Sequence, residues 1–283
     1  ATLYGRAKKL HSKTIILDSH CDSPMLFDEG ARFFEKNPKM LVDLHKMTAG
    51  RQDASFMVAY LKQEERDEAS LKAAVSKADS LLDLIEERIG ECNGKAAIAT
   101  TPQELWQNKF KGVKSVVKGI ENGYAIGHDI DNVDRFRSRG VAYMTLCHNG
   151  DNDICDSHKG NQEHNGLSDF GKQVVKRMNS VGMMVDLSHA SEKSFWDAME
   201  CSTKPIICSH SSSRALCDHT RNLTDDQMRA LSRSGGVAQV CLYSGFLKKD
   251  GNATVVDAVR HIMHMIDVMG INHVGIGSDF DGG

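Results

Sequence analysis

The sequence has no long apolar run, no block of like charge and only 4 prolines in 283 residues. No stretch approaches the ~20 consecutive apolar residues that cross a bilayer, so no transmembrane segment is predicted. The formal net charge is −3 and basic residues are not clustered, which removes the electrostatic basis for nucleic-acid binding. The scarcity of proline and the lack of low-complexity tracts argue against long disordered linkers.

Cysteine is present but not in metal-binding spacing. None of the 8 cysteines belongs to a Cys-x-x-Cys pair, so a cysteine zinc site is not expected. An even number permits disulfides without requiring them. Cys208 and Cys241 lie in apolar strand-like stretches and are expected to be small buried residues.

Eight short apolar stretches alternate with helical patterns along the chain. They cover residues 14–17, 54–60, 115–121, 141–148, 183–189, 205–210, 236–242 and 274–279. This alternation, without a break in composition, predicts parallel strands joined by helices. The economical interpretation is one (β/α)₈ (TIM) barrel over residues 1–283. A complete barrel needs a helix after the last strand, so we expect this chain to lack its last helix.

Several helix boundaries can be read directly. Apolar residues recur at steps of three and four across 67–91, which predicts a long amphipathic helix. Ser168 is placed to cap the next predicted long helix and Gly182 to end it. The segment 224–227 has the form of a capping box, and Pro102 opens a short helix.

Histidines and acidic residues stand at or just past the ends of most of these strands. They are His20, Asp22, Glu121, His148, His189, His210 and Asp279. In a parallel barrel the carboxyl ends of the strands meet on one face, where the active sites of this fold lie. Each residue alone has an ordinary explanation as a cap or a solvated side chain. Their coincidence on one rim predicts a shared site.

The chemistry of this set favours metal binding. His20 and Asp22 are two residues apart, so in an extended chain they point to one side, away from Cys21, and can hold one divalent cation. Histidine, aspartate and glutamate without cysteine are ligands for zinc or a similar metal in hydrolytic sites. Five candidate ligands exceed the need of one tetrahedral zinc, which favours two metals sharing a carboxylate. Glu121 is the natural bridge, because it lies between the two histidine-bearing halves of the rim.

Small residues lie beneath the charged strand ends. Gly119 is on the same side of its strand as Glu121, and Gly275 and Gly277 are on the side of Asp279. We expect these glycines to leave room for the metal centre.

These residues form motifs that resemble a known family. The motifs are His20-Cys21-Asp22, Glu121-Asn122-Gly123, Thr145-Leu146-Cys147-His148, Asp186-Leu187-Ser188-His189, Ser209-His210-Ser211, Arg221-Asn222 and Gly277-Ser278-Asp279-Phe280-Asp281-Gly282. In order and from about residue 14 to the end, they resemble the membrane dipeptidase (renal dipeptidase) family of zinc peptidases. The resemblance implies a TIM barrel of the metallo-dependent hydrolase type with a dinuclear zinc centre.

The resemblance also implies a role for each matching residue. His20 and Asp22 would bind one zinc, His189 and His210 the other, and Glu121 would bridge both. Asp279 would be the acid/base residue, His148 would contact the substrate carbonyl as a catalytic and binding group, and Arg221 would hold the terminal carboxylate of the dipeptide. Cys21 departs from the residue that relatives often carry, but it should face away from the metals.

The function expected from this resemblance is hydrolysis of dipeptides, including L-Xaa-D-Xaa, by a hydroxide bridging two zinc ions. One alternative is another dinuclear-metal amidohydrolase acting on a lactam, a lactone or a modified amino acid. A second is a metal-binding or ligand-binding homologue without turnover. Arg221 favours a substrate with a free carboxylate, although a surface arginine before a helix cap is the simpler interpretation of that residue alone.

Other polar residues receive ordinary interpretations. His261 and His264 are expected on a partly solvated helix face, and His158 and His164 in a solvated loop that could shape specificity. Asp186 is expected to face away from His189, toward the helices, with at most a supporting hydrogen bond.

The expected partners are limited to a small dipeptide substrate and, by resemblance, a second copy of the chain in a homodimer. The chain opens at Ala1 rather than at a methionine, which indicates a processed or trimmed N-terminus. Together with exported relatives in the family, this favours an extracytoplasmic location.

Overall fold

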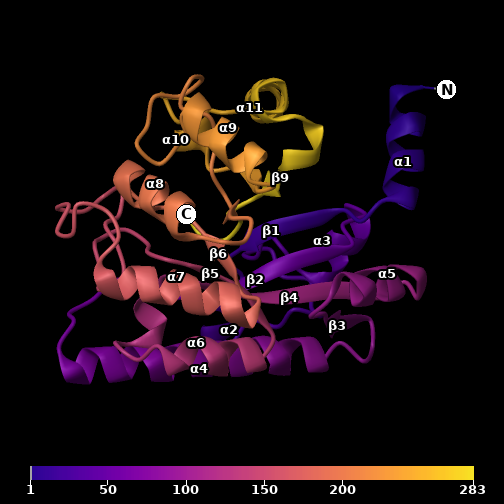
Figure 1. Cartoon of the computed structure of the whole chain (residues 1–283). Helices are drawn as coiled ribbons and strands as arrows, with labels where there is room; N and C mark the ends of the chain where they lie inside the picture. Colours follow the sequence, from indigo (N-terminus) through magenta and orange to yellow (C-terminus); the bar gives the residue numbers. More distant parts are fainter. Residues whose placement is uncertain (1) are drawn as a thin grey trace.

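The computed structural model describes residues 2–283 and contains a closed ring of parallel strands (Figure 1). The ring runs β2-β1-β9-β8-β7-β6-β5-β4 and closes through the pairing of β2 with β4. The strands are β1 (Leu17–Cys21), β2 (Ala54–Tyr60), β4 (Lys114–Glu121), β5 (Val141–Thr145), β6 (Met184–Asp186), β7 (Ile207–Cys208), β8 (Val237–Cys241) and β9 (Val274–Gly277). The eight-stranded (β/α)₈ barrel expected from the sequence is therefore confirmed.

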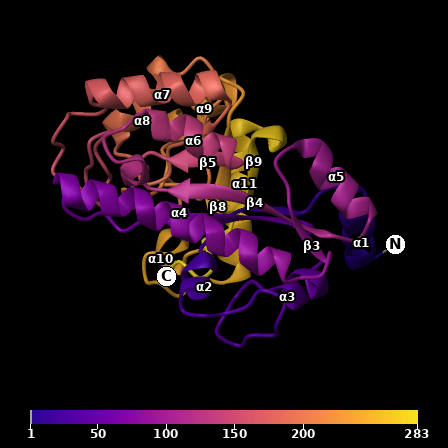
Figure 2. The same cartoon turned by 90° about the horizontal axis from the view of Figure 1, so that it is seen from below.

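Helices surround the ring and most of them pack on its outside, whereas the first one projects away from it and buries no side chain (Figures 1 and 2). They are α1 (Leu3–Lys13), α2 (Pro24–Asp28), α3 (Leu44–Ala49), α4 (Glu68–Gly90), α5 (Pro102–Phe110), α6 (Asp131–Ser138), α7 (Asp169–Val181), α8 (Glu192–Cys201), α9 (Asp225–Arg233), α10 (Ser244–Leu247) and α11 (Val255–Met269), with 3₁₀ turns η1 (Gly123–Ile126) and η2 (Ile271–His273). β9 is the last strand or helix of the described residues.

The predicted helix boundaries agree closely with these bounds. The Ser168 side chain caps α7, and Gly182 follows that helix in the left-handed conformation. Thr224 and Gln227 form the expected capping box of α9. The long amphipathic helix is α4, which packs along the outer side of β2, β3 and β4 (Figure 2).

Two features of the N-terminal third were not predicted. β1 begins at Leu17, so the first strand is shifted toward the site relative to the expected 14–17. A short ninth strand, β3 (Ala96–Ile98), pairs with the first residues of β4 on the edge where β5 joins further along. Three residues are too few to give a period-2 pattern, which is why sequence periodicity did not reveal β3.

Apolar side chains fill two separate regions. The larger one lies between the strands and the covering helices. The smaller one consists of Phe56, Val58, Ala99, Val117, Tyr143 and Ile207. Val117 lies on the same side of β4 as Glu121, because side chains alternate along a strand, so this smaller cluster is the floor beneath the charged rim.

None of the helices in residues 2–283 combines the length and the apolar character that a membrane span requires.

Candidate metal centre

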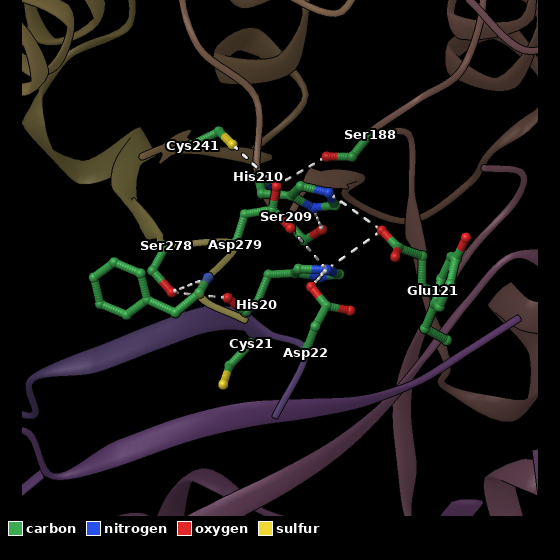
Figure 3. Close-up of polar contacts among 12 residues, drawn as sticks. His20, Cys21, Asp22, Glu121, Ser188, Ser209, His210, Cys241, Ser278 and Asp279 are labelled. Carbon is green, nitrogen blue, oxygen red and sulfur yellow. Dashed lines mark hydrogen bonds and ion pairs between the residues drawn. The ribbon is translucent and has the colours of Figure 1, made fainter. Parts of the chain in front are cut away.

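The seven predicted rim residues come together at the carboxyl ends of the strands. His20 lies in β1 and Glu121 is the last residue of β4, whereas the others follow the ends of their strands. Glu121 Oε2 is the central atom, since it lies 3.3 Å from His20 Nε2 and 3.2 Å from His210 Nε2 (Figure 3). It also lies 3.4 Å from His189 Nε2. Four strands separated by as many as 190 positions thus bring their side chains to one point.

Two aspartate carboxylates also lie beside His20. His20 Nε2 is 3.2 Å from Asp22 Oδ2 and 3.8 Å from Asp279 Oδ1. His148 also reaches the group, because one of its ring nitrogens lies within 4.8 Å of ligand atoms of both Glu121 and His189. The structure therefore brings together all five residues predicted as metal ligands, with Asp279 and His148 on the edges of the cluster.

The tautomer of His20 is determined by its neighbours. His20 Nδ1 lies 2.9 Å from the Tyr143 hydroxyl, and that hydroxyl donates its one proton to Ser19 O at 2.8 Å. Tyr143 must therefore accept from His20 Nδ1–H, which leaves Nε2 as the lone-pair nitrogen of the neutral ring. Nε2 is the atom that faces Glu121.

The other two ligand histidines are oriented in the same way. His189 Nδ1 faces Asn149 Oδ1 at 3.1 Å, an atom that can only accept. His210 Nδ1 lies 2.8 Å from Ser209 Oγ, whose own proton goes to a carboxylate. In their neutral forms, all three rings thus present an unprotonated Nε2 to the centre, as metal-binding imidazoles do when their other nitrogen donates to the protein.

The centre contains buried polar atoms that no protein group satisfies. Among residues 2–283, His20 Nε2, both carboxylate oxygens of Asp22 and Glu121 Oε2 are buried without a hydrogen-bond partner. Buried polar atoms are normally paired, and buried charges are paired or coordinate metals. These four unpaired atoms, together with the Nε2 atoms of His189 and His210 beside them, match the ligands of divalent metals such as zinc, so the residues fit a metal centre.

The electrostatics of the site favour added positive charge. Burial lowers the pKa of His20, but Tyr143, Glu121 and Asp22 outweigh it and raise this pKa well above its ordinary value. Burial and the proximity of Asp22 raise the pKa of Asp279 to about 8. The carboxylates therefore draw protons into the centre when no cation neutralises them.

Burial has the opposite effect on the remaining histidines. Burial and Arg221 hold the pKa of His189 well below its usual range, and burial together with His20 does the same for His210. Burial also lowers the pKa of His148. These three imidazoles are neutral near pH 7, as ligands and as hydrogen-bonding groups for a substrate require.

Two of the rim residues adopt the left-handed backbone conformation. The φ angles are 69° at His189 and 62° at Asp279, which is unusual for residues other than glycine. The backbone holds both in place, since His158 N donates to His189 O at 2.8 Å and Asp279 N donates to His20 O at 3.0 Å. Such strain concentrates at functional sites.

A cavity of about 680 Å³ opens above the centre. Its lining includes Asp22, Met25, Tyr60, Glu121, His148, Asn149, His158, Lys159, His189, His219, Thr220, Tyr243, Phe246 and Asp279. This volume is of the size that takes small-molecule ligands. Metal ligands form the floor, with aromatic and imidazole groups on the walls, an arrangement suited to a small polar substrate.

Comparison with known proteins places the chain in a family. Residues 4–283 match the family model described as membrane dipeptidase, peptidase family M19. The chain belongs to this family. A match over nearly the whole chain means that the fold and the general chemistry, metal-dependent dipeptide hydrolysis, are those of the M19 peptidases.

Individual relatives agree with this membership. An uncharacterised dipeptidase of Schizosaccharomyces pombe is 32% identical over 98% of this chain and 71% of its own length. A metallopeptidase from Rhodobacter sphaeroides, solved with a phosphinate mimic of the dipeptide L-Ala-D-Ala, is 25% identical with a TM-score of 0.86, covering 95% of this chain and 86% of that one. The probable dipeptidase PvdM of Pseudomonas aeruginosa, 24% identical with a TM-score of 0.91 over 99% of this chain and 86% of its own, shares the fold.

The two residues predicted to contact substrate in this M19 chain lie at different depths. His148 lines the cavity, with Nδ1 3.4 Å from the Tyr60 hydroxyl. Arg221 is 3% exposed and donates to Ser211 Oγ and to His210 O, with its guanidinium 5.6 Å over the Phe246 ring. Arg221 Nε is buried and has no partner among residues 2–283, so it retains a donor for a bound group.

Some residues around the site were missed or interpreted differently from the sequence. Tyr143 and Asn149 were not singled out, and Ser209 was quoted within a motif without a role, although a tyrosine or serine within an apolar strand is a signal for a buried hydrogen bond. His158 and His219 line the cavity, so His158 is not merely a solvated loop residue. Asp186 is completely buried and bonded to hydroxyls of neighbouring strand ends.

Three smaller expectations can also be assessed. Cys21 points away from the centre and contacts Ser23 (Figure 3). His261 is 1% exposed, accepts from Ser213 N and bonds to Leu247 O, so the prediction of a partly solvated face was wrong for this residue. A ring with two neutral partners of this kind is a structural histidine. His264 does lie on a half-buried face, beside Asp225.

The glycines beneath the rim make room for protein atoms. A Cβ at Gly277 would lie 1.8 Å from Ser209 O, and one at Gly119 would lie 3.0 Å from the Tyr143 ring. The expectation that they leave space for metals directly was therefore incomplete: they let neighbouring strands and Tyr143 approach, and these in turn position the ligands.

Proposed function

We propose that this chain is a dinuclear zinc dipeptidase that hydrolyses the peptide bond of dipeptides, including those with a D-residue at the C-terminal position. The observation that carries the proposal is the convergence of Glu121 Oε2 with three lone-pair Nε2 atoms at 3.2–3.4 Å. One carboxylate facing histidines from both halves of the rim suits a bridge between two cations. The L-Ala-D-Ala mimic bound to the Rhodobacter sphaeroides relative supports the inclusion of substrates with a C-terminal D-residue.

The ligands divide into two sets. His20 and Asp22 would hold one ion, and His189 and His210 the other, with Glu121 shared. When bound, two divalent cations polarise a carbonyl oxygen and lower the pKa of a water molecule toward neutrality. The set of histidine and carboxylate ligands without cysteine favours zinc over magnesium or calcium, which prefer oxygen ligands alone.

Asp279 is the group placed to move the proton. Its Oδ1 faces His20 across the centre, and its side chain reaches the cavity floor. The carboxylate takes a proton from the nucleophilic water and gives it to the leaving amine, as a general acid and base must do in turn. Burial and Asp22 raise the pKa of Asp279 to about 8 in the metal-free centre, and cations bound beside it would lower this pKa toward the carboxylate form that accepts the proton.

His148 and Arg221 provide the contacts to substrate. His148 is neutral and lines the cavity, so it can donate to the carbonyl oxygen as negative charge develops there. Arg221 provides a fixed positive charge near the Phe246 wall, where a free terminal carboxylate would be recognised. Such an anchor favours dipeptides over longer chains and over lactams without a carboxylate.

The test is an assay with added zinc. L-Ala-L-Ala, L-Ala-D-Ala, a tripeptide and a lactam form the panel, and turnover of the two dipeptides alone is expected. Asp279→Asn should reduce kcat at least 1,000-fold while zinc analysis still finds two ions per chain. Turnover of the lactam but not of the dipeptides would contradict the dipeptidase assignment, and full activity of Asp279→Asn would remove Asp279 from the mechanism.

A further inference from the structure

Two buried aspartates on opposite sides of the barrel share a set of three hydrogen bonds, and Asp186 accepts a fourth from Thr145 Oγ1. Asp186 Oδ1 accepts from Ser188 N at 3.1 Å and Ser209 N at 2.8 Å, and its Oδ2 accepts from Ser209 Oγ at 2.5 Å. Asp18 Oδ1 accepts from His20 N at 3.2 Å and from Ser278 N at 2.7 Å, and its Oδ2 accepts from Ser278 Oγ at 2.5 Å. In each case the aspartate bonds the amide two residues on and both donors of a serine on the next strand.

The serine of each pair stands directly before a rim residue. Ser209 precedes His210, and Ser278 precedes Asp279. Both aspartates are buried, and so are both serines. The repeated geometry therefore ties the ends of neighbouring strands, β6 to β7 and β1 to β9. Figure 3 shows the two serines, Ser209 and Ser278, beside the rim residues that follow them.

The two pairs differ in the second contact of the serine hydroxyl. Ser209 Oγ lies 2.8 Å from His210 Nδ1, whereas Ser278 Oγ lies 3.1 Å from a backbone carbonyl, His20 O. Only the Asp186–Ser209 pair therefore touches the ring of a candidate metal ligand.

The chemistry of the three groups determines which atom donates in each hydrogen bond from His210 through Ser209 to Asp186. An ionised carboxylate can only accept, so the Ser209 hydroxyl gives its proton to Asp186. Ser209 Oγ then has only lone pairs for His210, so His210 Nδ1 must carry the hydrogen. A neutral His210 consequently has its lone pair on Nε2, the atom 3.2 Å from Glu121 Oε2.

We propose that Asp186 and Ser209 are positioning residues that set the tautomer of His210 and so prepare it for the second metal ion. This inference rests on the dinuclear centre of the proposed function. Neither residue touches the cavity; both act through His210. Loss of such a supporting contact lowers metal affinity by typically 10- to 100-fold.

Asp186→Asn keeps the shape of the side chain but reverses the donor and acceptor roles in the hydrogen bonds that run from residue 186 through Ser209 to His210. The two backbone amides that face Oδ1 hold the amide oxygen of the asparagine, so its NH₂ group faces Ser209 and Thr145. Ser209 then accepts from asparagine, and its own proton turns toward His210 Nδ1. His210 is left with its hydrogen on Nε2, pointing into the metal centre.

Thr145→Val is the matched control on the same carboxylate. Thr145 Oγ1 donates to Asp186 Oδ2 at 2.6 Å but makes no contact with His210. Valine has nearly the same shape, so this variant removes one hydroxyl that donates to Asp186. The contacts of Ser209 with Asp186 and His210 stay in place. Asp18→Asn is the second control, because it makes the same substitution in the matching pair that does not touch an imidazole ring.

The experiment measures zinc binding to metal-free protein by competition with a chromophoric chelator, together with thermal unfolding. Wild type and both controls should bind two zinc ions, whereas Asp186→Asn should bind one of the two at least 10-fold more weakly. Equal zinc affinity in Asp186→Asn and wild type, or the same loss in Thr145→Val, would overturn the positioning role. Failure of wild type to bind two zinc ions would instead contradict the proposed function.

A second measurement does not depend on whether Asp186→Asn folds. Nitrogen-15 spectra of histidine side chains distinguish the two neutral tautomers. His210 of the metal-free wild type should carry its hydrogen on Nδ1, and Ser209→Ala should remove that preference. A wild-type His210 with its hydrogen on Nε2 would overturn the inference directly.

Discussion

His189 Nε2 and His210 Nε2 lie 3.1 Å apart, and both are lone-pair nitrogens of neutral imidazoles. No hydrogen lies between them, because each ring places its proton on Nδ1. Two lone pairs at this distance repel unless a positive charge joins them. The backbone and the surrounding hydrogen bonds therefore hold the two rings in an arrangement that a positive charge between them, a proton or a bound cation, makes favourable.

Addition of zinc should stabilise the metal-free protein strongly. Binding to the folded state alone stabilises it by ~4 kcal/mol per site at a free concentration 1,000 times Kd. For two sites and about 2 °C per kcal/mol in a domain of this size, Tm should rise by roughly 15 °C. Differential scanning calorimetry with zinc and with chelator measures the change.

The control for that measurement is Glu121→Gln. This variant replaces the central carboxylate by a neutral amide of the same shape, so the increase in Tm should fall to less than half. An unchanged increase would mean that zinc binds the protein elsewhere.

Gly277→Ala should destabilise the protein by at least about 3 kcal/mol, at the upper end of overpacking effects. The new Cβ would lie 1.8 Å from Ser209 O and 2.7 Å from Ser19 Oγ, so the backbone before His210 must move. Gly275→Ala is the matched control two residues earlier, where the Cβ would meet only Gln239 Cγ at 3.0 Å. Urea unfolding should show a much smaller loss in the control. A loss in Gly277→Ala as small as that in Gly275→Ala would contradict the prediction, because it would show that the backbone at the end of β7 moves easily to accommodate the extra carbon atom.

Arg221→Lys should raise KM for dipeptides at least 10-fold, because an ammonium group cannot reproduce the planar pair of donors. Assays with a dipeptide and its C-terminal amide distinguish the possible causes. If Arg221 holds the carboxylate, the substitution should affect the free acid and have little effect on the amide. Equal losses on both substrates would mean that Arg221 acts only by supporting His210 O and Ser211. Arg214→Lys, which changes a nearby arginine that bonds Glu192 and the Asn222 carbonyl, is the control.

His158 should make the stability of the metal-free protein depend on pH. Burial, followed by the proximity of Arg221, lowers the pKa of His158 to about 3. The unfolded chain binds a proton there below about pH 6.5, whereas the folded protein does not, so stability falls as the pH drops from 6.5 toward 3. His158→Gln removes this contribution, and its unfolding free energy should fall less steeply over the same range. Urea unfolding with chelator at several pH values provides the measurement, and parallel curves for the two proteins would contradict the assignment.

The sequence was sufficient to predict the barrel and the convergence of the seven rim residues, whereas their roles as metal ligands and catalytic groups stay predictions. The strands are regular enough to be recognised, and parallel strands in a closed ring leave no choice about which ends meet. Residues as distant as His20 and Asp279 could therefore be assigned to one rim before their separation was known.

The supporting hydrogen bonds could not be predicted in the same way. Whether Ser209 faces a histidine or a carbonyl depends on side-chain torsions, and its counterpart Ser278 shows that the same local motif has both outcomes. The burial of His261 has a similar origin, since its partners Ser213 and Leu247 lie on separate segments. The depth of Arg221 was also hidden, because a residue before a helix cap has no periodicity to reveal burial.

The bond between Asp18 and Ser278 joins positions 260 residues apart. Until β9 reaches β1, His20 has no Asp279 beside it and the ring of strands is open. During synthesis on the ribosome, the residues up to Asp279 must therefore emerge before the ligands of the centre can assemble. The sheet stays open for that interval, so the centre can form only late in the folding of the barrel.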